Sequence, residues 1–310
     1  MRGKNILITG AAGFIGSNLV ESLIEENRIV AVDNLSNGSE ENIREFYSHE
    51  NFTFHKIDVK DKVKLKKVLD GIDIIFHLSA NADVRRGYGD TKVDMEENMI
   101  ATYSVLESMR ENDVNELIFS STSTVYGNVT VIPTPENYGP LIPISHYGAS
   151  KLAAEAFIFS FSNNYGFRSS IFRFANIVGK KSSHGVIFDF KRKLKKNREV
   201  LEVLGDGTQS KSYLHVDDCI EGILKLHGKS DGLFNLGTKQ RTSVTEIANM
   251  MIEKYAPNAR IEFTGGPGGA GWTGDVKTMQ LDISKAERNG WKYKYESKEA
   301  VRKAIEEAGE

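Results

Sequence analysis

Residues 5–16 read Asn5-Ile6-Leu7-Ile8-Thr9-Gly10-Ala11-Ala12-Gly13-Phe14-Ile15-Gly16, an apolar strand pattern followed at once by three spaced glycines. The periodicity predicts a buried strand over residues 5–9 and a helix over residues 14–26. At such a junction the first glycine permits a tight turn, the second lets the backbone approach a pyrophosphate, and the third lets helix and strand pack closely. Phosphates would meet unpaired N–H groups at the positive end of the helix dipole. The stretch therefore predicts a dinucleotide-binding unit.

Strand and helix patterns alternate from this unit to residue 174. Strands are predicted at 28–33, 52–58, 72–78, 116–120 and 168–174, and helices at 38–49, 61–69, 94–111 and 147–165. Short apolar strands that alternate with amphipathic helices imply right-handed crossovers and a parallel sheet covered on both faces. The sequence therefore predicts an α/β fold with a doubly wound (Rossmann) parallel sheet.

Asp33 ends the second predicted strand, 17 residues after Gly16. A carboxylate there accepts hydrogen bonds from an adenosine ribose and repels a 2′-phosphate. Residues 34–37 follow with no arginine that could bind such a phosphate. The alternative is that Asp33 only caps the following turn. Combined with the glycines, it predicts NAD rather than NADP as the cofactor.

The chain after residue 173 alternates less regularly. Helices are predicted at 186–197, 217–228, 243–255 and 297–308, and short strands at 200–204, 211–216, 233–237 and 260–264. We expect residues 1–172 to form an NAD-binding domain and residues 173–310 a smaller α/β substrate-binding domain. A stretch of roughly residues 211–245 is expected to return to the first domain. The glycine-rich residues 265–271 are flexible enough to serve as a moving loop.

Composition excludes several classes of partner. The formal net charge is −2 and the sequence pI about 6.4, so no global field recruits nucleic acid or an anionic membrane. Cys219 is the only cysteine, which rules out an intrachain disulfide, and the seven histidines show no close metal-ligand spacing. No apolar run approaches the ~20 residues that span a bilayer, and no charged-then-apolar leader is present. We expect a cytoplasmic protein without a metal.

A possible proton acceptor lies in the stretch His146-Tyr147-Gly148-Ala149-Ser150-Lys151. Tyr147 and Lys151 are four residues apart, so a helix would present both side chains on one face. A phenol normally ionises near pH ~10, and a nearby ammonium lowers that pKa. The pair could therefore act as a base, although two surface residues on an amphipathic helix would have the same spacing.

A cluster of hydroxyl groups follows the strand at residues 116–120. The chain continues Ser121-Thr122-Ser123-Thr124-Val125-Tyr126-Gly127. At the carboxyl end of a central strand such side chains point into the ligand crevice. The alternative is that they only satisfy the backbone of a turn.

Seven motifs in order carry a resemblance to a known family. They are TGAAGFIG (9–16), VDNLSNG (32–38), HLSA (77–80), SSTSTVYG (120–127), YGASK (147–151), RFAN (173–176) and KSYLHVDD (211–218). In this set the chain resembles the extended short-chain dehydrogenases/reductases, and among them the nucleotide-sugar epimerases. The nearest resemblance is to UDP-glucose 4-epimerases of the archaeal type.

The resemblance implies an NAD-dependent 4-epimerase that interconverts UDP-glucose and UDP-galactose through a transient 4-keto sugar and bound NADH. Tyr147 would be the base, Lys151 would bind the nicotinamide ribose and lower the pKa of that tyrosine, and Thr122 would bind the reacting hydroxyl. Cofactor-binding positions would be Gly10, Gly13, Phe14, Ile15, Gly16, Asp33, Asn34, Asp58, Val59, Leu78, Ser79, Ala80, Asn98, Ser120, Tyr147, Lys151 and Phe174. Substrate-binding positions would be Thr122, Asn176, Val186, Lys211 and Asp275. The family also implies a homodimer that pairs the helices near 94–111 and 147–163.

The chain departs from the family where the diphosphate is bound. Lys211 replaces the more usual arginine, and a lysine supplies charge without a bidentate fork. Trp272-Thr273-Gly274-Asp275 stands where many relatives have an arginine before Gly-Asp, and Ala270 where archaeal-type relatives often have one before Gly-Trp. Candidates to supply the missing contacts are Arg85, Arg86, Lys180 and Lys181. Met279 lies near the position that gates N-acetyl sugars.

Other activities share the same fold. Epimerases of UDP-N-acetylhexosamines or uronic acids reuse the same tyrosine and lysine and remain alternatives. A 4,6-dehydratase would need acidic residues directly after the catalytic threonine, where Ser123 and Thr124 stand. A reductase is disfavoured because Asp33 argues against NADPH. A non-catalytic nucleotide sensor would usually have lost Tyr147 or Lys151.

Overall fold

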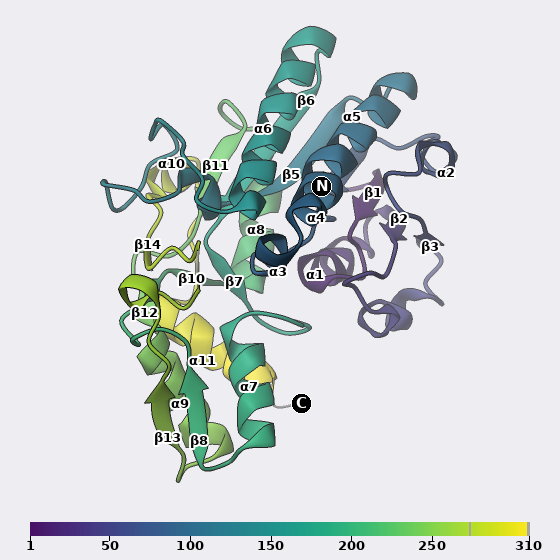
Figure 1. Cartoon of the computed structure of the whole chain (residues 1–310). Helices are drawn as coiled ribbons and strands as arrows, with labels where there is room; N and C mark the ends of the chain where they lie inside the picture. Colours follow the sequence, from purple (N-terminus) through teal and green to yellow (C-terminus); the bar gives the residue numbers. More distant parts are fainter. Residues whose placement is uncertain (273, 309–310) are drawn as a thin grey trace.

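The computed structural model describes residues 1–272 and 274–308, and a seven-stranded sheet forms its centre (Figure 1). The strand order is β11-β6-β5-β4-β1-β2-β3, and every neighbouring pair is parallel. The strands are β1 (Asn5–Thr9), β2 (Arg28–Asp33), β3 (Phe52–Lys56), β4 (Ile74–His77), β5 (Glu116–Thr122), β6 (Arg168–Phe174) and β11 (Leu233–Leu236). The order reverses at β1, so the predicted doubly wound fold is confirmed. In such sheets ligands bind at the carboxyl ends of the strands beside the reversal.

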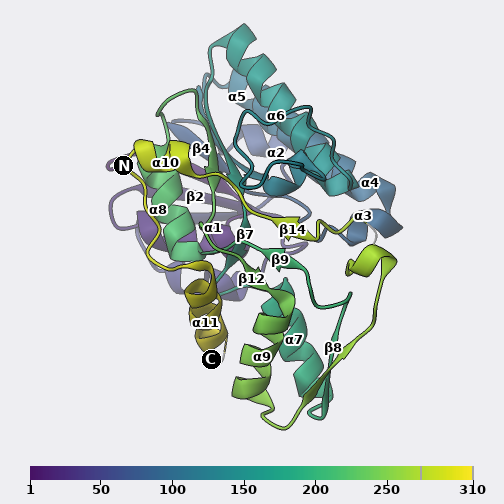
Figure 2. The same ribbon diagram turned by 90° about the vertical axis from the view of Figure 1, so that its left-hand side faces the viewer.

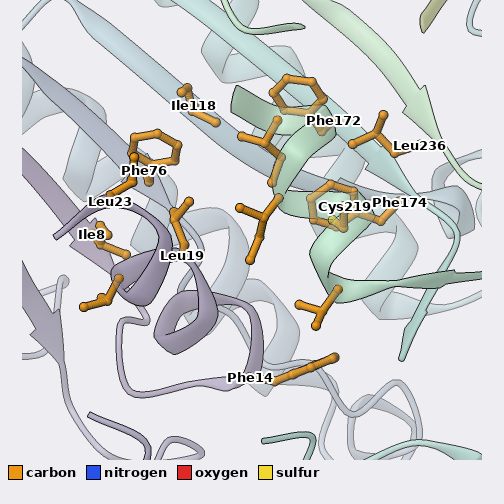
Figure 3. Packing of buried hydrophobic residues seen from close by; sticks show 14 of the residues in the cluster. Ile8, Phe14, Leu19, Leu23, Phe76, Ile118, Phe172, Phe174, Cys219 and Leu236 are labelled. Carbon is orange, nitrogen blue, oxygen red and sulfur yellow. The ribbon is translucent and has the colours of Figure 1, made fainter. Parts of the chain in front are cut away.

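Helices cover both faces of this sheet because alternate strand residues point to opposite sides. On one side Ile8 and Phe76 pack with residues of α1 (Phe14–Leu23) and α8 (Val216–Leu226), as Figure 3 shows for Leu19, Leu23 and Cys219. On the other side lie α2 (Lys62–Lys66), α5 (Ala101–Glu111) and α6 (His146–Tyr165), which bury Leu65, Val105 and Ala154 against strand residues such as Leu7.

Two predicted helices take a different form. Residues 38–49 contain two short 3₁₀ helices, η1 (Glu40–Asn42) and η2 (Arg44–Phe46), so the prediction of one helix there is wrong. Ser39 Oγ accepts from Glu41 N and Asn42 Nδ2 donates to Ala12 O, and such side-chain bonds compete with a helical ladder. The helix predicted at 94–111 is divided into α4 (Thr91–Asp94), the π-helical turn η3 (Met95–Ile100) and α5.

The remaining elements form a smaller lobe and its connections to the sheet (Figure 2). Short strands pair as β7 with β10, β9 with β12 and β14, and β8 with β13. The elements are α3 (Arg86–Gly89), η4 (Ser123–Tyr126), β7 (Asn176–Val178), α7 (Val186–Lys196), β8 (Val200–Val203), β9 (Ser210–Lys211), β10 (Tyr213–His215), β12 (Thr242–Ser243), α9 (Val244–Tyr255), β13 (Arg260–Phe263), η5 (Pro267–Gly269), β14 (Thr278–Met279), α10 (Ser284–Arg288) and α11 (Ser297–Glu307). β11 joins the main sheet beside β6. The division into two domains near residue 172 stays a prediction.

The described residues include neither a membrane-spanning helix nor a cluster of metal-ligating side chains. No helix within residues 1–272 and 274–308 combines the length and the apolar character needed to cross a membrane. The same residues contain no group of three or more His, Cys, Asp or Glu side chains placed to hold a metal ion.

Candidate active site

The glycine turn between β1 and α1 is packed too tightly for any side chain. Gly10 has a φ of +69°, and a Cβ there would lie 2.7 Å from Ser79 N. A Cβ at Gly16 would lie 2.1 Å from Gly10 O. No side chain of the described residues caps the first N–H groups of α1, which begins after Gly13. The turn therefore presents bare backbone to the cavity, as a pyrophosphate-binding turn requires.

Asp33 both caps a turn and faces the cavity. Its Oδ1 accepts from Leu35 N at 2.7 Å and its Oδ2 from Ala12 N at 3.0 Å. Burial raises the pKa of Asp33, and these two backbone bonds oppose the rise. Beside it, Asn34 Nδ2 donates to Asp58 Oδ2 at 3.3 Å. Asp33 therefore caps the turn, as the alternative interpretation predicted. It also lines the cavity, where it was expected to bind the adenosine ribose.

A cavity of about 880 Å³ runs from this turn to the smaller lobe. Its lining includes nearly every predicted site residue: Gly10, Gly13, Phe14, Ile15, Gly16, Asp33, Asn34, Asp58, Val59, Leu78, Ser79, Ala80, Ser120, Thr122, Tyr147, Lys151, Phe174, Asn176, Val186, Lys211 and Asp275. The carboxyl ends of parallel strands meet at this edge, which explains why residues distant in sequence gather there. The individual contacts of these residues with ligands stay predictions.

Asn98 lies behind the cavity wall rather than in it. The side chain is buried, its Oδ1 accepts from Asn81 N at 2.8 Å, and its Nδ2 donates to Ser150 Oγ at 2.9 Å. Ser150 Oγ in turn donates to Tyr147 O at 2.8 Å. In the described part of the chain Asn98 therefore positions the first turn of α6, and its contact with the cofactor stays a prediction.

Three predicted catalytic residues meet at the end of β5. Thr122 opposes the rise in the pKa of the Tyr147 phenol, and its hydroxyl oxygen accepts from Thr124 N at 3.1 Å. Lys151 Nζ donates to Ser120 O at 2.9 Å and lies 4.6 Å from the centre of the Phe119 ring. The side chains of Thr122, Tyr147 and Lys151 thus line one wall of the cavity.

Burial governs the ionisation of this group. It raises the pKa of Tyr147 to about 12, and the Asp94 carboxylate adds to the rise while Thr122 opposes it. Burial lowers the pKa of Lys151 to about 7, against the opposing charges of Glu155 and Asp94. The pKa of Tyr147 is thus raised, whereas the prediction was that Lys151 lowers it, because the loss of solvation exceeds any gain from the lysine.

A buried ion pair below the catalytic residues was not anticipated. Arg173 donates to Glu155 through Nε at 3.0 Å and Nη2 at 2.6 Å, and the side chains are 4% and 2% exposed. Ser121 Oγ also donates to Glu155. Glu155 lies one turn after Lys151 on α6, and Arg173 opens the RFAN motif on β6. The sequence signals were the helix-face position of Glu155 and the motif position of Arg173. The two side chains come together only when α6 packs on the sheet.

A second unanticipated group links β1 to the helices. His77 Nδ1 lies 2.8 Å from Thr9 Oγ1, and His77 Nε2 lies 3.0 Å from Thr102 Oγ1. The Thr102 hydroxyl donates to Asn98 O. Burial lowers the pKa of His77 to about 3, with a smaller contribution from Lys151. His77 is thus a neutral bridge between the glycine turn and the helix that carries Asn98.

The expected diphosphate region is organised around an ion pair. Lys211 Nζ lies 2.6 Å from Asp275 Oδ1, and Asp275 Oδ2 accepts from Gly271 N at 3.1 Å. Lys211 Nζ is also 5.5 Å from the centre of the Trp272 ring. Met279 pairs with Lys211 in the β14–β9 register and lines the cavity. Thr273 lies outside the described residues.

The four basic residues proposed to compensate for missing arginines lie in different places. Arg85, Lys180 and Lys181 line the cavity, whereas Arg86 is outside the lining formed by the described residues. Arg85 Cζ lies 5.9 Å from the centre of the Trp272 ring. Lys180 and Lys181 belong to the segment of residues 179–185 and pair with Glu21 and Glu45.

Together, the doubly wound sheet, the bare glycine turn and the Thr122–Tyr147–Lys151 group define an enzyme of the extended short-chain dehydrogenase/reductase type. The chain belongs to the NAD dependent epimerase/dehydratase family, whose sequence model matches residues 6–237. NAD is therefore its cofactor, and the bare turn and Asp33 fit that dinucleotide.

Relatives in this family act on several nucleotide sugars. A putative UDP-glucose 4-epimerase of Methanocaldococcus jannaschii is 32% identical over 97% of each chain. A solved UDP-galactose 4-epimerase is 38% identical over 98% of each chain, with a TM-score of 0.84. A UDP-glucuronic acid 4-epimerase from Bacillus cereus, solved with UDP-glucuronic acid and NAD, is 27% identical over 98% of this chain and 99% of its own, with a TM-score of 0.89. An epimerase is supported, and the sugar differs among the relatives.

Proposed function

We propose that this protein is a UDP-glucose 4-epimerase that interconverts UDP-glucose and UDP-galactose and keeps its NAD bound between turnovers. The observation that carries the proposal is that Thr122, Tyr147 and Lys151 line the same cavity as the glycine turn and the Lys211–Asp275 pair. A proton acceptor, a dinucleotide turn and a candidate nucleotide-sugar contact therefore share one enclosed space. Relatives of 32% and 38% identity are a putative UDP-glucose and a UDP-galactose 4-epimerase, which supports this choice.

The residues divide the work of the reaction. Tyr147 takes the proton of the sugar 4-hydroxyl and returns it after the sugar has turned, while Thr122 orients the phenol. NAD, held by the glycine turn and Asp33, would supply the acceptor and then the donor of the C4 hydride, and its positive charge would favour the phenolate. Lys151, with a pKa of about 7, carries a positive charge below that pH and adds to this effect. Burial of Lys151 and enclosure of the site keep water from the 4-keto sugar.

The residues after Thr122 favour epimerisation over dehydration. Ser123 and Thr124 occupy the positions where a dehydratase would carry its acids. Thr124 N donates to Thr122 Oγ1 at 3.1 Å, and the Thr124 hydroxyl lies 3.1 Å from the same atom. The neighbouring acid Glu155 is held by Arg173. The second candidate is a 4-epimerase of UDP-uronic acids, which the Bacillus cereus relative favours.

We also propose a homodimer formed through α5 and α6. Phe157 and Phe159 on α6 are 39% and 37% exposed, and Ile100, immediately before α5, is 38% exposed. Phe157 already packs edge-on against Tyr103 of α5, with ring centres 5.9 Å apart. A second copy would cover this apolar surface, and analytical ultracentrifugation of the wild type and of Phe157→Ser would test the pairing.

The activity is tested by incubating the purified protein with UDP-glucose, and separately with UDP-galactose, without added NAD. We expect both reactions to reach the same mixture of the two sugars, followed by NMR of the anomeric protons. UDP-glucuronic acid serves as the parallel substrate for the second candidate. Absence of exchange at C4 of UDP-glucose and UDP-galactose, even with NAD supplied, would refute the proposed function.

A further inference from the structure

In the part of the cavity wall expected to face the nucleotide sugar, the basic side chain of Lys211 is already paired with an acidic one. Lys211 lies 2.6 Å from the Asp275 carboxylate, whose side chain is 3% exposed. The ammonium of Lys211 is thus already neutralised within the protein. A diphosphate brings negative charge into the cavity, and a buried charge must be paired and hydrogen-bonded. Another cation is therefore needed beside this pair.

Two of the three cavity-lining cations considered are engaged elsewhere. Lys180 Nζ donates to both carboxylate oxygens of Glu21, at 2.7 and 2.9 Å. Lys181 Nζ donates to Glu45 Oε1 at 2.9 Å and to Asn42 O at 3.0 Å. These bonds tie the segment of residues 179–185 to α1 and to the chain around η1 and η2. Of the other basic residues in the lining, Lys191, Arg192 and Lys195 lie on α7, whereas Arg85 lies beside Trp272 and Lys211 and is therefore the candidate.

Arg85 lies next to the Lys211–Asp275 ion pair, on the same tryptophan ring. Its guanidinium carbon lies 5.9 Å from the Trp272 ring centre, and Lys211 Nζ lies 5.5 Å from the same ring centre. Asp83 holds Arg85 by its backbone N at 3.0 Å and its Nε at 3.4 Å. Among the described residues no acceptor is hydrogen-bonded to the two terminal nitrogens of Arg85. Such a pair of parallel donors matches the oxygens of a phosphate.

The Trp272 indole adds a second donor. Its Nε1 is buried and finds no hydrogen-bond partner in the described part of the chain. Trp272 lines the cavity. An indole N–H can only donate, so a ligand that satisfies it must offer an acceptor. Phosphate oxygens are acceptors only, and they would satisfy both Trp272 and Arg85.

We propose that Arg85 binds the diphosphate of the nucleotide sugar, stacked on Trp272, beside the Lys211 ammonium that Asp275 already neutralises. The proposal rests on the proposed function and names how its substrate is held. An arginine stacked on an aromatic ring is held in one orientation, which preserves its bidentate fork.

The test measures binding of UDP to the NAD-loaded protein by isothermal titration calorimetry. We expect Arg85→Gln to weaken UDP binding about 10- to 100-fold, the loss typical of a charge-assisted hydrogen bond. Binding of uridine, which has no phosphate, should change less than about twofold. Arg86→Gln, the next residue and outside the cavity lining, is the matched control and should bind UDP as the wild type does. The NAD content of each variant is measured in parallel.

A rescue variant separates a ligand contact from a structural effect. Arg85→Gln combined with Trp272→Arg supplies a cation from the neighbouring position in the same lining, and we expect it to regain most of the lost UDP affinity. Unchanged UDP binding by Arg85→Gln would overturn the proposal. So would a loss of NAD, which would place Arg85 at the cofactor. Because binding is measured without turnover, wild-type protein that binds UDP but does not epimerise refutes the activity alone.

Discussion

Replacing Arg173 by methionine should severely destabilise the protein, because it leaves Glu155 charged and unpaired inside the core. The pair is bidentate, at 3.0 and 2.6 Å, with both side chains nearly inaccessible to solvent. Methionine retains much of the apolar stem, so the change removes mainly the guanidinium. Among the hydrogen bonds that Glu155 accepts from the described residues, only that from the Ser121 hydroxyl would remain.

The magnitude follows from the burial of the pair. Removing one partner of a buried ion pair typically costs 3–5 kcal/mol, roughly, because the other charge is left uncompensated. A domain has only about 5–15 kcal/mol of total stability, so the loss is a large fraction. Removing both charges, as Arg173→Met with Glu155→Leu, should recover most of it. The Ser121 hydroxyl then lacks its acceptor, and that should leave a deficit of roughly 1–3 kcal/mol.

The assay is urea unfolding of the wild type, the single variants Arg173→Met and Glu155→Leu, and the double variant, with NAD in the same excess and circular dichroism as the signal. We expect the double variant to unfold at a higher urea concentration than Arg173→Met. A loss below about 1 kcal/mol in the single variant, or a double variant that equals the sum of the two single changes, would refute the reasoning. The latter result would mean that the two charges do not interact.

Three further predictions follow from the site. Tyr147→Phe should lower turnover about 100-fold or more while NAD content is unchanged, and loss of NAD would show that the residue has another role. Gly16→Ala, whose new Cβ would lie 2.1 Å from Gly10 O, should abolish NAD retention. The control Gly89→Ala, with open space around the new Cβ, should retain NAD. Bound NAD is released from each protein by heating and quantified by chromatography. Because burial lowers the pKa of His77 to about 3, unfolded protein takes up a proton that folded protein does not as the pH falls below 6.5. Stability should decline by up to roughly 5 kcal/mol between pH 6.5 and 3, and less steeply in His77→Gln; equal slopes of the urea midpoint against pH would contradict the assignment.

The main sheet could be predicted because its signals are local. The strand patterns at 5–9, 28–33 and 168–174 match β1, β2 and β6 residue for residue. The helix expected at 38–49 was wrong because the side chain of Asn42 bonds to Ala12, thirty positions earlier in the chain. Such a contact exists only after β1 and β2 have paired, so no periodicity in residues 38–49 indicates it.

The candidate site, like the sheet, was predicted where its signals are local and missed where they depend on packing. The glycine turn and the Tyr147–Lys151 spacing are visible in short windows of sequence, and both line the cavity. The rise in the pKa of Tyr147 is a property of the packed protein, since burial is its largest cause. Similarly, the Lys211–Asp275 pair joins residues 64 positions apart, and Asn98 needed its neighbours to reveal that it faces Ser150.

The ties of the segment of residues 179–185 bear on the order in which the molecule folds and opens. Lys180 meets Glu21 across 159 positions of the chain, its carbonyl accepts from Asn18 across 162, and Lys181 meets Glu45 across 136. Contacts of such long range gain nothing until the intervening chain is ordered, so we expect this wall of the cavity to form late. Its bonds are largely ion pairs at the surface, which contribute little individually. In hydrogen exchange the backbone amides of residues 179–185 should therefore open well before those of β1, and bound NAD should slow that local opening.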